Sequence, residues 1–165
     1  MAKIYRAQEK WKLDSGFSEL DLNIIFLAGS IDMGKAEMWQ PEIEEALKDD
    51  DVVIFNPRRL DFDATQPYIP ENPYMSGQIK WELIHLDRAN ICVFYFDPNG
   101  KAPITLYEMG RVSLRVKCGL ATGIVYCPEG YWKRTNVIIN AEFDGFIIVE
   151  SKKELIDTLK RLIKE

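Results

Sequence analysis

The sequence contains few of the residues that bind metal ions or form disulfide bonds. Its three cysteines, Cys92, Cys118 and Cys127, include no Cys-x-x-Cys pair, and His85 is its only histidine. A zinc site would lack recognisable ligand spacing, so we expect no metal. An odd number of cysteines, with Cys92 inside an apolar run, favours a reducing compartment over a secreted disulfide framework.

Long apolar runs and an excess of positive charge are also absent. No apolar run approaches the roughly 20 residues that span a bilayer, and residues 1–5 do not open a signal peptide. Twenty-six acidic side chains against 21 basic ones give a net charge of -5, so attraction to a phosphate backbone is not a general feature of the surface. We expect a cytoplasmic protein that binds neither a membrane nor a nucleic acid.

Length and composition are those of one globular domain. Of the 165 residues, 47% are hydrophobic and 28% are charged, which distinguishes the chain from disordered and membrane proteins. A chain of this length usually folds around a single core. We therefore expect one domain over residues 1–165.

Short apolar runs that are rich in β-branched and aromatic residues predict buried strands. These runs lie at residues 23–28, 52–55, 91–96, 124–127 and 146–149. Helical patterns lie at residues 38–48, 78–87, 105–118 and 152–163. Because strands and helices alternate, the sequence predicts an α/β fold: a single-domain three-layer sandwich with a parallel sheet of about five strands and helices on both faces.

Two segments stand outside this alternation. Residues 1–22 alternate only weakly and contain the turn signal Ser15-Gly16, which predicts a hairpin-like N-terminal arm or an oligomer contact. Residues 58–77 contain three prolines and are long for a connection, which favours an active-site loop or lid. In open parallel sheets the ligand lies beyond the carboxyl ends of the strands. That rule selects the loops at residues 29–35, 56–60, 97–104 and 128–136.

The first of these loops matches a phosphate-binding motif in part. Residues 29–35, GSIDMGK, fit G-x-x-x-x-G-K directly after a strand. A phosphate-loop NTPase needs a Ser or Thr hydroxyl next, where this chain has Ala36, and Asp32 places negative charge among the amides meant for phosphate. A degenerate NTPase is therefore a minor alternative. The other interpretation is a glycine turn at Gly29, Ser30 and Ile31, whose free amides hold a sugar or a phosphate.

The strongest single feature is the segment of residues 103–111, PITLYEMGR, between the third strand and the helix that follows. Two interpretations of Glu108 stay open. Thr105-x-x-Glu108 is a capping box, in which Glu108 only accepts a backbone hydrogen bond. Alternatively, a carboxylate in the first turn feels the positive end of the helix dipole and stays ionised, as a glycosidic nucleophile must.

A second carboxylate lies on the preceding helix. Glu82 shares or adjoins the apolar stripe formed by Ile79, Leu83 and Leu86, so burial would raise its pKa and make it a candidate general acid. The alternative is a half-exposed Glu82 bonded to a neighbour such as Lys80 or Trp81.

Other polar groups follow the second, third and fourth strands. Asp97 is a third candidate for the acid–base role, although residues 97–100 also fit a plain turn. Asn56, Arg58 and Arg59 would hold a carboxylate or a phosphate, or else form a solvated loop in which the arginines pair with Asp61 or Asp63. Residues 126–136 combine aromatic rings with the amide of Asn136, which suits base stacking or a subunit interface. We interpret His85 as a packing or surface residue because it lacks a nucleophilic partner.

Taken together, these residues resemble the nucleoside 2-deoxyribosyltransferase-like superfamily. The resemblance rests on FLAGSI at 26–31, Trp39, NPRR at 56–59, QIKWE at 78–82, PITLYEMGR at 103–111 and CPEG at 127–130 leading to Asn136. It implies a flavodoxin-like or Rossmann-like fold, Glu108 as the nucleophile that forms a covalent deoxyribosyl-enzyme, and a homodimer or higher homo-oligomer with shared sites. Asn136 resembles the amide that a neighbouring subunit contributes.

The sequence departs from the family pattern at three places. Ile25-Phe26 stands where many members carry a tyrosine, Glu82 replaces an aspartate on the second helix, and Asp97 is the nearest substitute for an aspartate before the nucleophile. We therefore predict Glu108, Glu82 and Asp97 as catalytic residues. The predicted substrate-binding residues are Gly29, Ser30, Ile31, Asn56, Arg58, Arg59, Tyr107 and Asn136.

The predicted reaction is cleavage of a nucleoside N-glycosidic bond and transfer of the sugar to another nucleobase. With water as acceptor, the same site would be a nucleoside or nucleotide hydrolase, and without turnover the fold would be a sensor for a nucleotide or an ADP-ribose-like signal. No cofactor is expected, because the nucleophile is a side chain and protons handle the leaving group.

Overall fold

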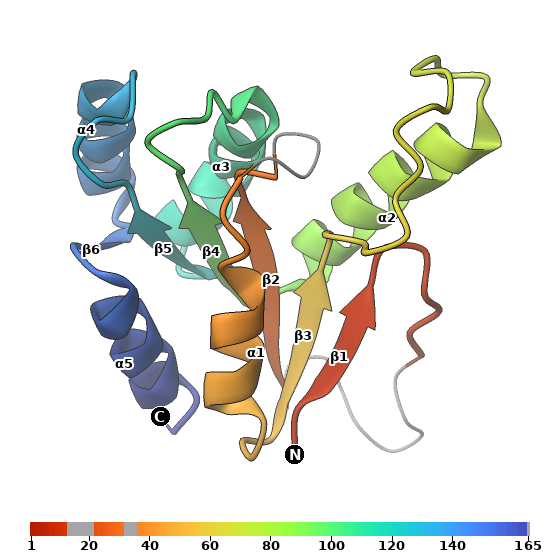
Figure 1. Cartoon of the computed structure of the whole chain (residues 1–165). Coiled ribbons are helices and arrows are strands. Elements are labelled where there is room, and N and C mark those ends of the chain that lie inside the picture. Colours follow the sequence, from red (N-terminus) through yellow and green to blue (C-terminus); the bar gives the residue numbers. More distant parts are fainter. Residues whose placement is uncertain (13–21, 32–35, 165) are drawn as a thin grey trace.

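The computed structural model describes residues 1–12, 22–31 and 36–164, and its centre is a parallel sheet (Figure 1). Among these residues the sheet has six strands in the order β1-β3-β2-β4-β5-β6, all parallel. The strands are β1 (Lys3–Arg6), β2 (Asn23–Gly29), β3 (Val52–Asn56), β4 (Ile91–Tyr95), β5 (Thr122–Tyr126) and β6 (Ile147–Val149). The predicted α/β class is confirmed, with one strand more than the five expected.

Helices cover both faces of the sheet, which confirms the three-layer sandwich. The described helices are α1 (Gln40–Leu47), α2 (Pro73–Arg88), α3 (Pro103–Lys117), α4 (Arg134–Asp144) and α5 (Lys152–Leu162). Helices α1 and α5 lie on one face and α2, α3 and α4 on the other (Figure 1). Both faces of the central strands are therefore buried, as the continuous apolar runs predicted.

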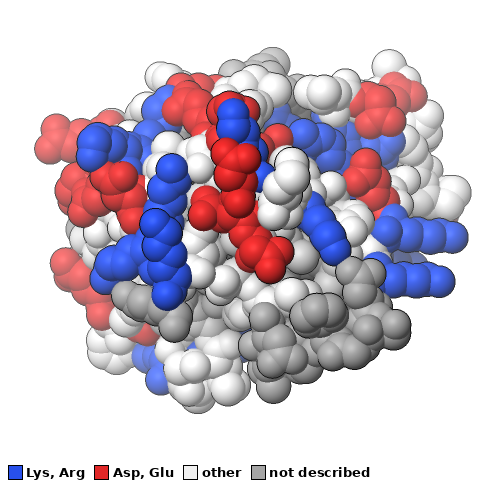
Figure 2. Space-filling view, turned by 90° about the horizontal axis from the view of Figure 1, so that it is seen from below, with Lys and Arg blue, Asp and Glu red and all other residues white. Residues whose placement is uncertain are grey.

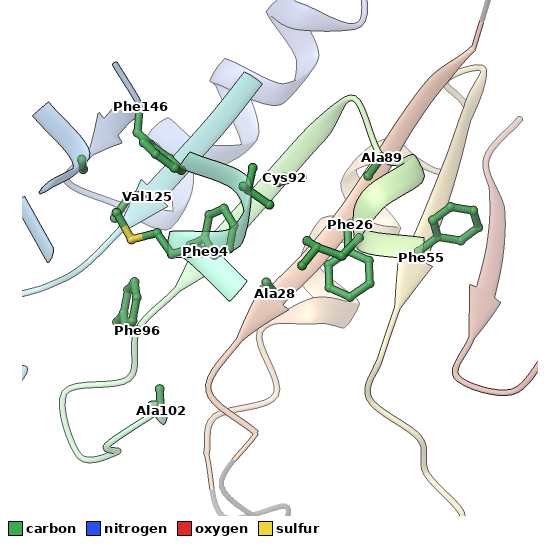
Figure 3. Close-up of a cluster of buried hydrophobic side chains, with 14 of the residues drawn as sticks. Phe26, Ala28, Phe55, Ala89, Cys92, Phe94, Phe96, Ala102, Val125 and Phe146 are labelled. Carbon is green, nitrogen blue, oxygen red and sulfur yellow. The ribbon is translucent and has the colours of Figure 1, made fainter. Parts of the chain in front are cut away.

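Alternate residues of each central strand enter two separate cores. In β2, Ile25 and Leu27 pack beneath α1 and α5, whereas Ile24, Phe26 and Ala28 join the core beneath α2, α3 and α4. Figure 3 shows this second core, which contains Phe26 of β2, Phe94 of β4 and Phe96, the residue that follows β4 by one position. The fully buried aromatic rings fix how closely α2 and α3 approach the sheet.

The N-terminal segment differs from the prediction. Residues 3–6 form an edge strand that pairs in parallel with β3, with Ile4 opposite Ile54, instead of an arm. Trp11 packs on Phe55 with ring centroids 5.3 Å apart. An edge strand exposes one of its sides, which explains the weak apolar alternation of its sequence. The turn predicted at Ser15-Gly16 lies outside the described residues.

Helix α2 starts earlier than predicted and buries a different stripe. It begins at Pro73, because the Asn72 side chain caps it by accepting a hydrogen bond from Tyr74 N at 3.0 Å and proline suits the first helical position. The loop after β3 therefore ends at residue 72 and not at 77. The buried positions are Met75, Gln78, Trp81, His85 and Leu86, whereas Ile79 is 40% exposed.

Residues 134–144 form helix α4, which the sequence had not predicted. Part of the segment had been expected as a loop over residues 128–136. The helix ends at Gly145, whose φ of 82° is the left-handed conformation that glycine adopts readily. Its buried stripe is narrow, with only Val137 and Ala141 fully enclosed, so the apolar period was weak in the sequence.

Charged side chains of both signs lie beside one another on the face seen from below in Figure 2. No helix in the described ranges is both long and apolar enough to span a bilayer. The predictions of a cytoplasmic location and of a single domain over residues 1–165 stay predictions.

Candidate active site

Most of the predicted site residues meet at the carboxyl edge of the sheet, near the point where its strand order reverses. From β2 the chain crosses to β3 on one side and returns to β4 on the other, which makes the β2–β4 pair a topological switch point. Gly29 ends β2, Asn56 ends β3, Asp97 follows β4, and α3 begins nearby (Figure 1).

Glu108 lies on the buried side of α3 and is 7% exposed. The helix begins at Pro103 after Ala102, which has a left-handed φ of 44°, and no side chain caps it. Thr105 is thus inside the first turn, and the capping-box interpretation is wrong. Within the described part of the chain, the Glu108 carboxyl group has no hydrogen-bond partner, so the helix start does not explain this glutamate.

The protonation of Glu108 also differs from the prediction. Burial, and secondarily the charge of Glu82, raise the pKa of Glu108 to about 8. We had expected the helix dipole to hold this carboxylate ionised. The dipole fails to do so because Glu108 is the sixth residue of α3, beyond the first turn in which that field is strong, while burial penalises the charged form.

Glu82 is the second member of a carboxyl pair that α2 and α3 bring together. Burial raises the pKa of Glu82 to about 7, as predicted, and a hydrogen bond from Gln78 opposes that rise. The Gln78 Nε2 atom lies 2.6 Å from Glu82 Oε1. The two partners suggested for Glu82 by the sequence, Lys80 and Trp81, do not bind it. Trp81 Nε1 donates to the Glu9 carbonyl at 2.9 Å, and Lys80 is exposed.

The two glutamates titrate as a coupled pair. Both have pKa values near neutrality, so the pair holds about one proton at pH 7 to 8. The order is the reverse of the predicted roles, because Glu108 is the weaker acid. Two neighbouring carboxyl groups with one shared proton can act as a nucleophile and an acid in turn.

Asp97 has a different environment from the glutamate pair. Its Oδ2 accepts a hydrogen bond from Glu37 N at 3.1 Å, and its Oδ1 accepts one from Asn99 N at 2.8 Å. Its own backbone N–H donates to Ser30 Oγ at 3.0 Å. Asp97 therefore anchors both ends of the 30–37 segment and closes its own turn, in which Gly100 N bonds to the Asp97 carbonyl.

The last residue of β2, Gly29, is closely packed. A Cβ atom on Gly29 would lie 2.7 Å from a ring carbon of Trp39 and 2.7 Å from the Tyr95 carbonyl oxygen. Ser30 is buried and its N–H donates to that carbonyl at 2.9 Å, while Ile31 is half-buried. Asp32 and Lys35 of the partial phosphate-loop motif lie outside the described residues.

Asn56 and Arg58 form hydrogen bonds with protein groups at the carboxyl edge of the sheet. Asn56 Nδ2 donates to Glu44 Oε1 at 2.6 Å, and Glu44 also receives both terminal nitrogens of Arg6 at 2.7 and 2.9 Å. Arg58 is buried and donates to the carbonyls of Ala36 and Glu37 at 3.1 and 2.8 Å. Arg58 thus fixes the end of the segment that Asp97 also anchors.

Arg59 pairs with Asp61, as the solvated-loop interpretation predicted. Its Nε and Nη2 atoms each lie 3.0 Å from an Asp61 oxygen, and its guanidinium lies 4.9 Å above the Tyr74 ring. Asp63 instead accepts bonds from Thr65 within the loop. A hollow of about 390 Å³ adjoins this loop, and neither Glu82 nor Glu108 lines it. Its lining residues are Arg6, Ala7, Gln8, Glu9, Arg59, Leu60 and Asp61.

Two predicted substrate-binding residues point away from the pair. Tyr107 is 63% exposed on α3, and Asn136 is exposed on α4, where its backbone carbonyl accepts a bond from Asn140 Nδ2 at 2.7 Å. His85 is a packing residue, as predicted: its ring lies 4.1 Å from Trp81 and 4.4 Å from Phe55, and Nδ1 donates to the Trp81 carbonyl at 2.7 Å. Among the described residues no group of three or more His, Cys, Asp or Glu side chains is placed to hold a metal ion.

Sequence reasoning missed three polar residues of this edge. Arg6 and Glu44 are far apart in the chain and gave no signal, because only the β1–β3 pairing and α1 bring them together. Gln78 stood within a motif but was assigned no role. Its spacing of four residues from Glu82 on one helix was the signal that could have found it.

The protein is thus an α/β sandwich that carries a pair of interacting carboxyl groups on α2 and α3. Residues 23–131, well over half of the chain, match a family model described as "Nucleoside 2-deoxyribosyltransferase like". The chain therefore belongs to the nucleoside 2-deoxyribosyltransferase-like family, which confirms the resemblance seen in the sequence. The matched region contains Glu82 and Glu108 and excludes β1 and Asn136. A comparison with curated proteins finds no match.

Proposed function

We propose that this protein cleaves the N-glycosidic bond of a nucleoside or deoxynucleoside, with Glu108 as nucleophile and Glu82 as acid and base. The observation that supports it most is the carboxyl pair formed by the buried Glu108 and the half-buried Glu82. The pKa values of about 7 for Glu82 and about 8 for Glu108 allow one ionised and one protonated group at neutral pH. In addition, no residue in the described part of the chain forms a hydrogen bond with the Glu108 carboxyl group. Membership of the family supports a nucleoside as the substrate class.

The reaction has two displacements. An ionised Glu108 oxygen attacks the anomeric carbon, the carbon–nitrogen bond breaks, and Glu82 gives its proton to the departing base. An acceptor nitrogen or a water oxygen then attacks the same carbon, Glu108 leaves with its electron pair, and Glu82 takes back a proton. The two inversions restore the original anomer.

Transfer to a second base is the activity we favour, and hydrolysis is the alternative. Exclusion of water from the site would favour transfer. The loop of residues 57–72 is the candidate lid. It is tied to the start of α2 by a bond from Asn72 Nδ2 to the Pro67 carbonyl at 2.9 Å and a bond from Asp63 N to the Tyr74 hydroxyl at 2.7 Å.

One incubation tests these outcomes. The protein is mixed with a deoxynucleoside and a second free base, and the products are separated by chromatography. A new nucleoside indicates transfer, a released base alone indicates hydrolysis, and unchanged substrate over a panel of purine and pyrimidine deoxynucleosides contradicts the proposal and favours the sensor. Glu82→Gln and Glu108→Gln should both abolish the reaction, while Glu142→Gln, an exposed glutamate on α4, is the matched control.

The covalent step has its own test. A nucleoside with fluorine at C2 of the sugar slows both displacements, so the glycosyl-enzyme accumulates. Mass spectrometry of the digested protein should place the added sugar on the peptide that contains Glu108. An adduct elsewhere, or full turnover without any adduct, would contradict the role of this residue.

We also propose that the protein forms a homodimer or larger homo-oligomer through the outer faces of α3 and α4. These helices expose large apolar side chains: Ile104, Tyr107, Leu114, Ile139 and Phe143, each at least 56% exposed. Asn136 lies on the same helix as the last two, so a neighbouring copy would bring it near another site. Sedimentation of the wild-type protein and of Phe143→Ser should show an assembly that the substitution weakens.

A further inference from the structure

Gln78 makes a contact that the proposed chemistry has not used. It lies on the buried side of α2 and is 8% exposed. Its Nε2 donates to the Pro57 carbonyl at 3.0 Å and to Glu82 Oε1 at 2.6 Å. Its Oε1 is buried and has no partner among the described residues. A buried amide with only one of its two ends bonded calls for a physical reason.

The Pro57 carbonyl fixes the direction of the Gln78 amide. A carbonyl oxygen only accepts hydrogen bonds, so it must face the NH₂ end of the amide. The reverse orientation would place two acceptor oxygens against each other and would remove the donor from Glu82. In the free site Glu82 therefore faces an N–H group, and a donor to a carboxylate favours the ionised form.

Few other titratable groups face this pair. Glu82 on α2 and Glu108 on α3 act on each other, and the described neighbour from the sheet is the Cys92 thiol on β4. Burial raises the pKa of Cys92 to about 12, so the thiol is neutral. Arg115 and Asp87 act on that thiol and do not contribute to the shifts of the glutamates. Among the described residues, Gln78 is the one hydrogen-bond donor to either carboxyl group, and its bond goes to Glu82.

We propose that Gln78 is a positioning residue that keeps the shared proton of the carboxyl pair on Glu108 while the site is free. Loss of the Gln78–Glu82 bond, when a substrate group takes the N–H, moves that proton from Glu108 to Glu82. The exchange changes no net charge: Glu108 becomes the carboxylate and Glu82 the acid. The free enzyme then holds its nucleophile protonated until the site is occupied. The catalytic consequence rests on the proposed function, whereas the placement of the proton does not.

A titration that needs no activity tests the proton placement. The full chain is labelled with ¹³C at the glutamate carboxyl carbons, and the signals of Glu82 and Glu108 are followed by NMR from pH 4 to 10, roughly the range over which such groups titrate. Gln78→Met removes the donor and keeps a similar volume. We expect the pKa of Glu82 to rise by about one unit, a tenfold gain in proton affinity, so that Glu82 becomes as weak an acid as Glu108 or weaker.

The matched control is Gln40→Met, which removes another buried glutamine amide, on α1 across the sheet. It should leave both glutamate titrations unchanged. If Gln78→Met leaves Glu82 unchanged or lowers its pKa, or if Gln40→Met has the same effect, the proposal is wrong. Should Gln78→Met fail to fold, as judged by its amide spectrum, Gln78→Ala removes the same amide and is titrated in its place.

The pH–rate profile separates the two proposals. In the active wild type the acid limb reports loss of the first proton from the pair, so Gln78→Met should move that limb to higher pH, by less than one unit because Glu108 then loses the first proton. A shifted titration in a protein without turnover would retain the role of Gln78 and refute the proposed reaction. Turnover with an unshifted acid limb would refute the role of Gln78 alone.

Discussion

Asp97 and Glu108 are both buried carboxyl groups, each 7% exposed, yet their surroundings are opposite. Both Asp97 oxygens accept backbone N–H groups, and its own N–H is also bonded. Glu108 receives no hydrogen bond from the described residues and faces a second carboxyl group. The comparison shows that burial alone does not mark a catalytic acid. A carboxylate that backbone amides satisfy supports the structure, whereas one that lacks donors is available for chemistry.

The largest effect should follow from Glu108→Gln. An amide of the same size cannot attack carbon, so turnover should fall by about 10³-fold or more. The melting temperature should stay within a few degrees or rise, because no hydrogen bond to a described residue is lost and a buried ionisable group is removed. Rates by chromatography and melting by circular dichroism check both. If the variant is unfolded, or if its rates are normal, Glu108 has a structural role like that of Asp97.

A second test uses the pH dependence of stability. The pKa of Glu108 rises on folding from its usual 4.5 to about 8, so between these values the folded state binds more protons than the unfolded state. Stability from this group is therefore complete below about pH 4.5 and is lost as pH rises through 8, with a slope of up to about 1.4 kcal/mol per pH unit. The free energies of unfolding of the wild type and of Glu108→Gln, measured with urea, should therefore change differently with pH between about 4.5 and 8. Parallel curves would mean that Glu108 titrates normally.

The close packing at the end of β2 can be tested with two glycines, one of which serves as an open control. Gly29→Ala places a methyl group 2.7 Å from the Tyr95 backbone and should cost about 1–3 kcal/mol in the free energy of unfolding. Gly110→Ala, in α3 with no atom outside its neighbouring helix backbone within 4 Å of the new methyl group, should stabilise by about 0.5–1 kcal/mol. Chemical denaturation measures both. Equal effects of the two substitutions would contradict the close approach at Gly29.

A smaller cost in stability than that of Gly29→Ala is expected from Asp97→Asn. One amide oxygen remains an acceptor, but the NH₂ group then faces a backbone N–H, which should cost about 1–2 kcal/mol of stability. Hydrogen exchange at the Glu37 amide should become faster. The Michaelis constant should rise while the limbs of the pH–rate profile stay in place. If Asp97→Asn instead removed one limb of the pH–rate profile and left stability unchanged, Asp97 would be the catalytic acid that the sequence suggested.

The sequence predicted well the features that depend on local pattern. The continuous apolar runs of the central strands and the alternation with helices indicated a parallel sandwich, because both faces of such strands are buried. Glu82 was expected to have a raised pKa from its place beside an apolar stripe, and the pKa is raised. Edge strand β1 and helix α4 were missed, since an edge strand and a narrow stripe bury too little to leave a strong pattern.

The site was harder to predict because its properties depend on contacts between distant segments. Asp97 and Glu108 were both candidates, and only the amides of Glu37 and Asn99 separate them. Arg58 was expected to bind a ligand, but it donates to the backbone carbonyls of Ala36 and Glu37. The direction of the Glu108 shift was wrong because the helix start and the depth of burial were both unknown.

The sequence by itself determined the alternation of the central strands with helices, the family and the identity of the acidic side chains, because these follow from residue type and spacing along one chain. Only the tertiary structure decided which carboxyl groups have hydrogen-bond donors and which face each other. The physical reason is that the ionisation of a buried acid depends on the groups that surround it in space. Here those groups come from α2, α3 and the loop after β3, which are adjacent only in the folded chain.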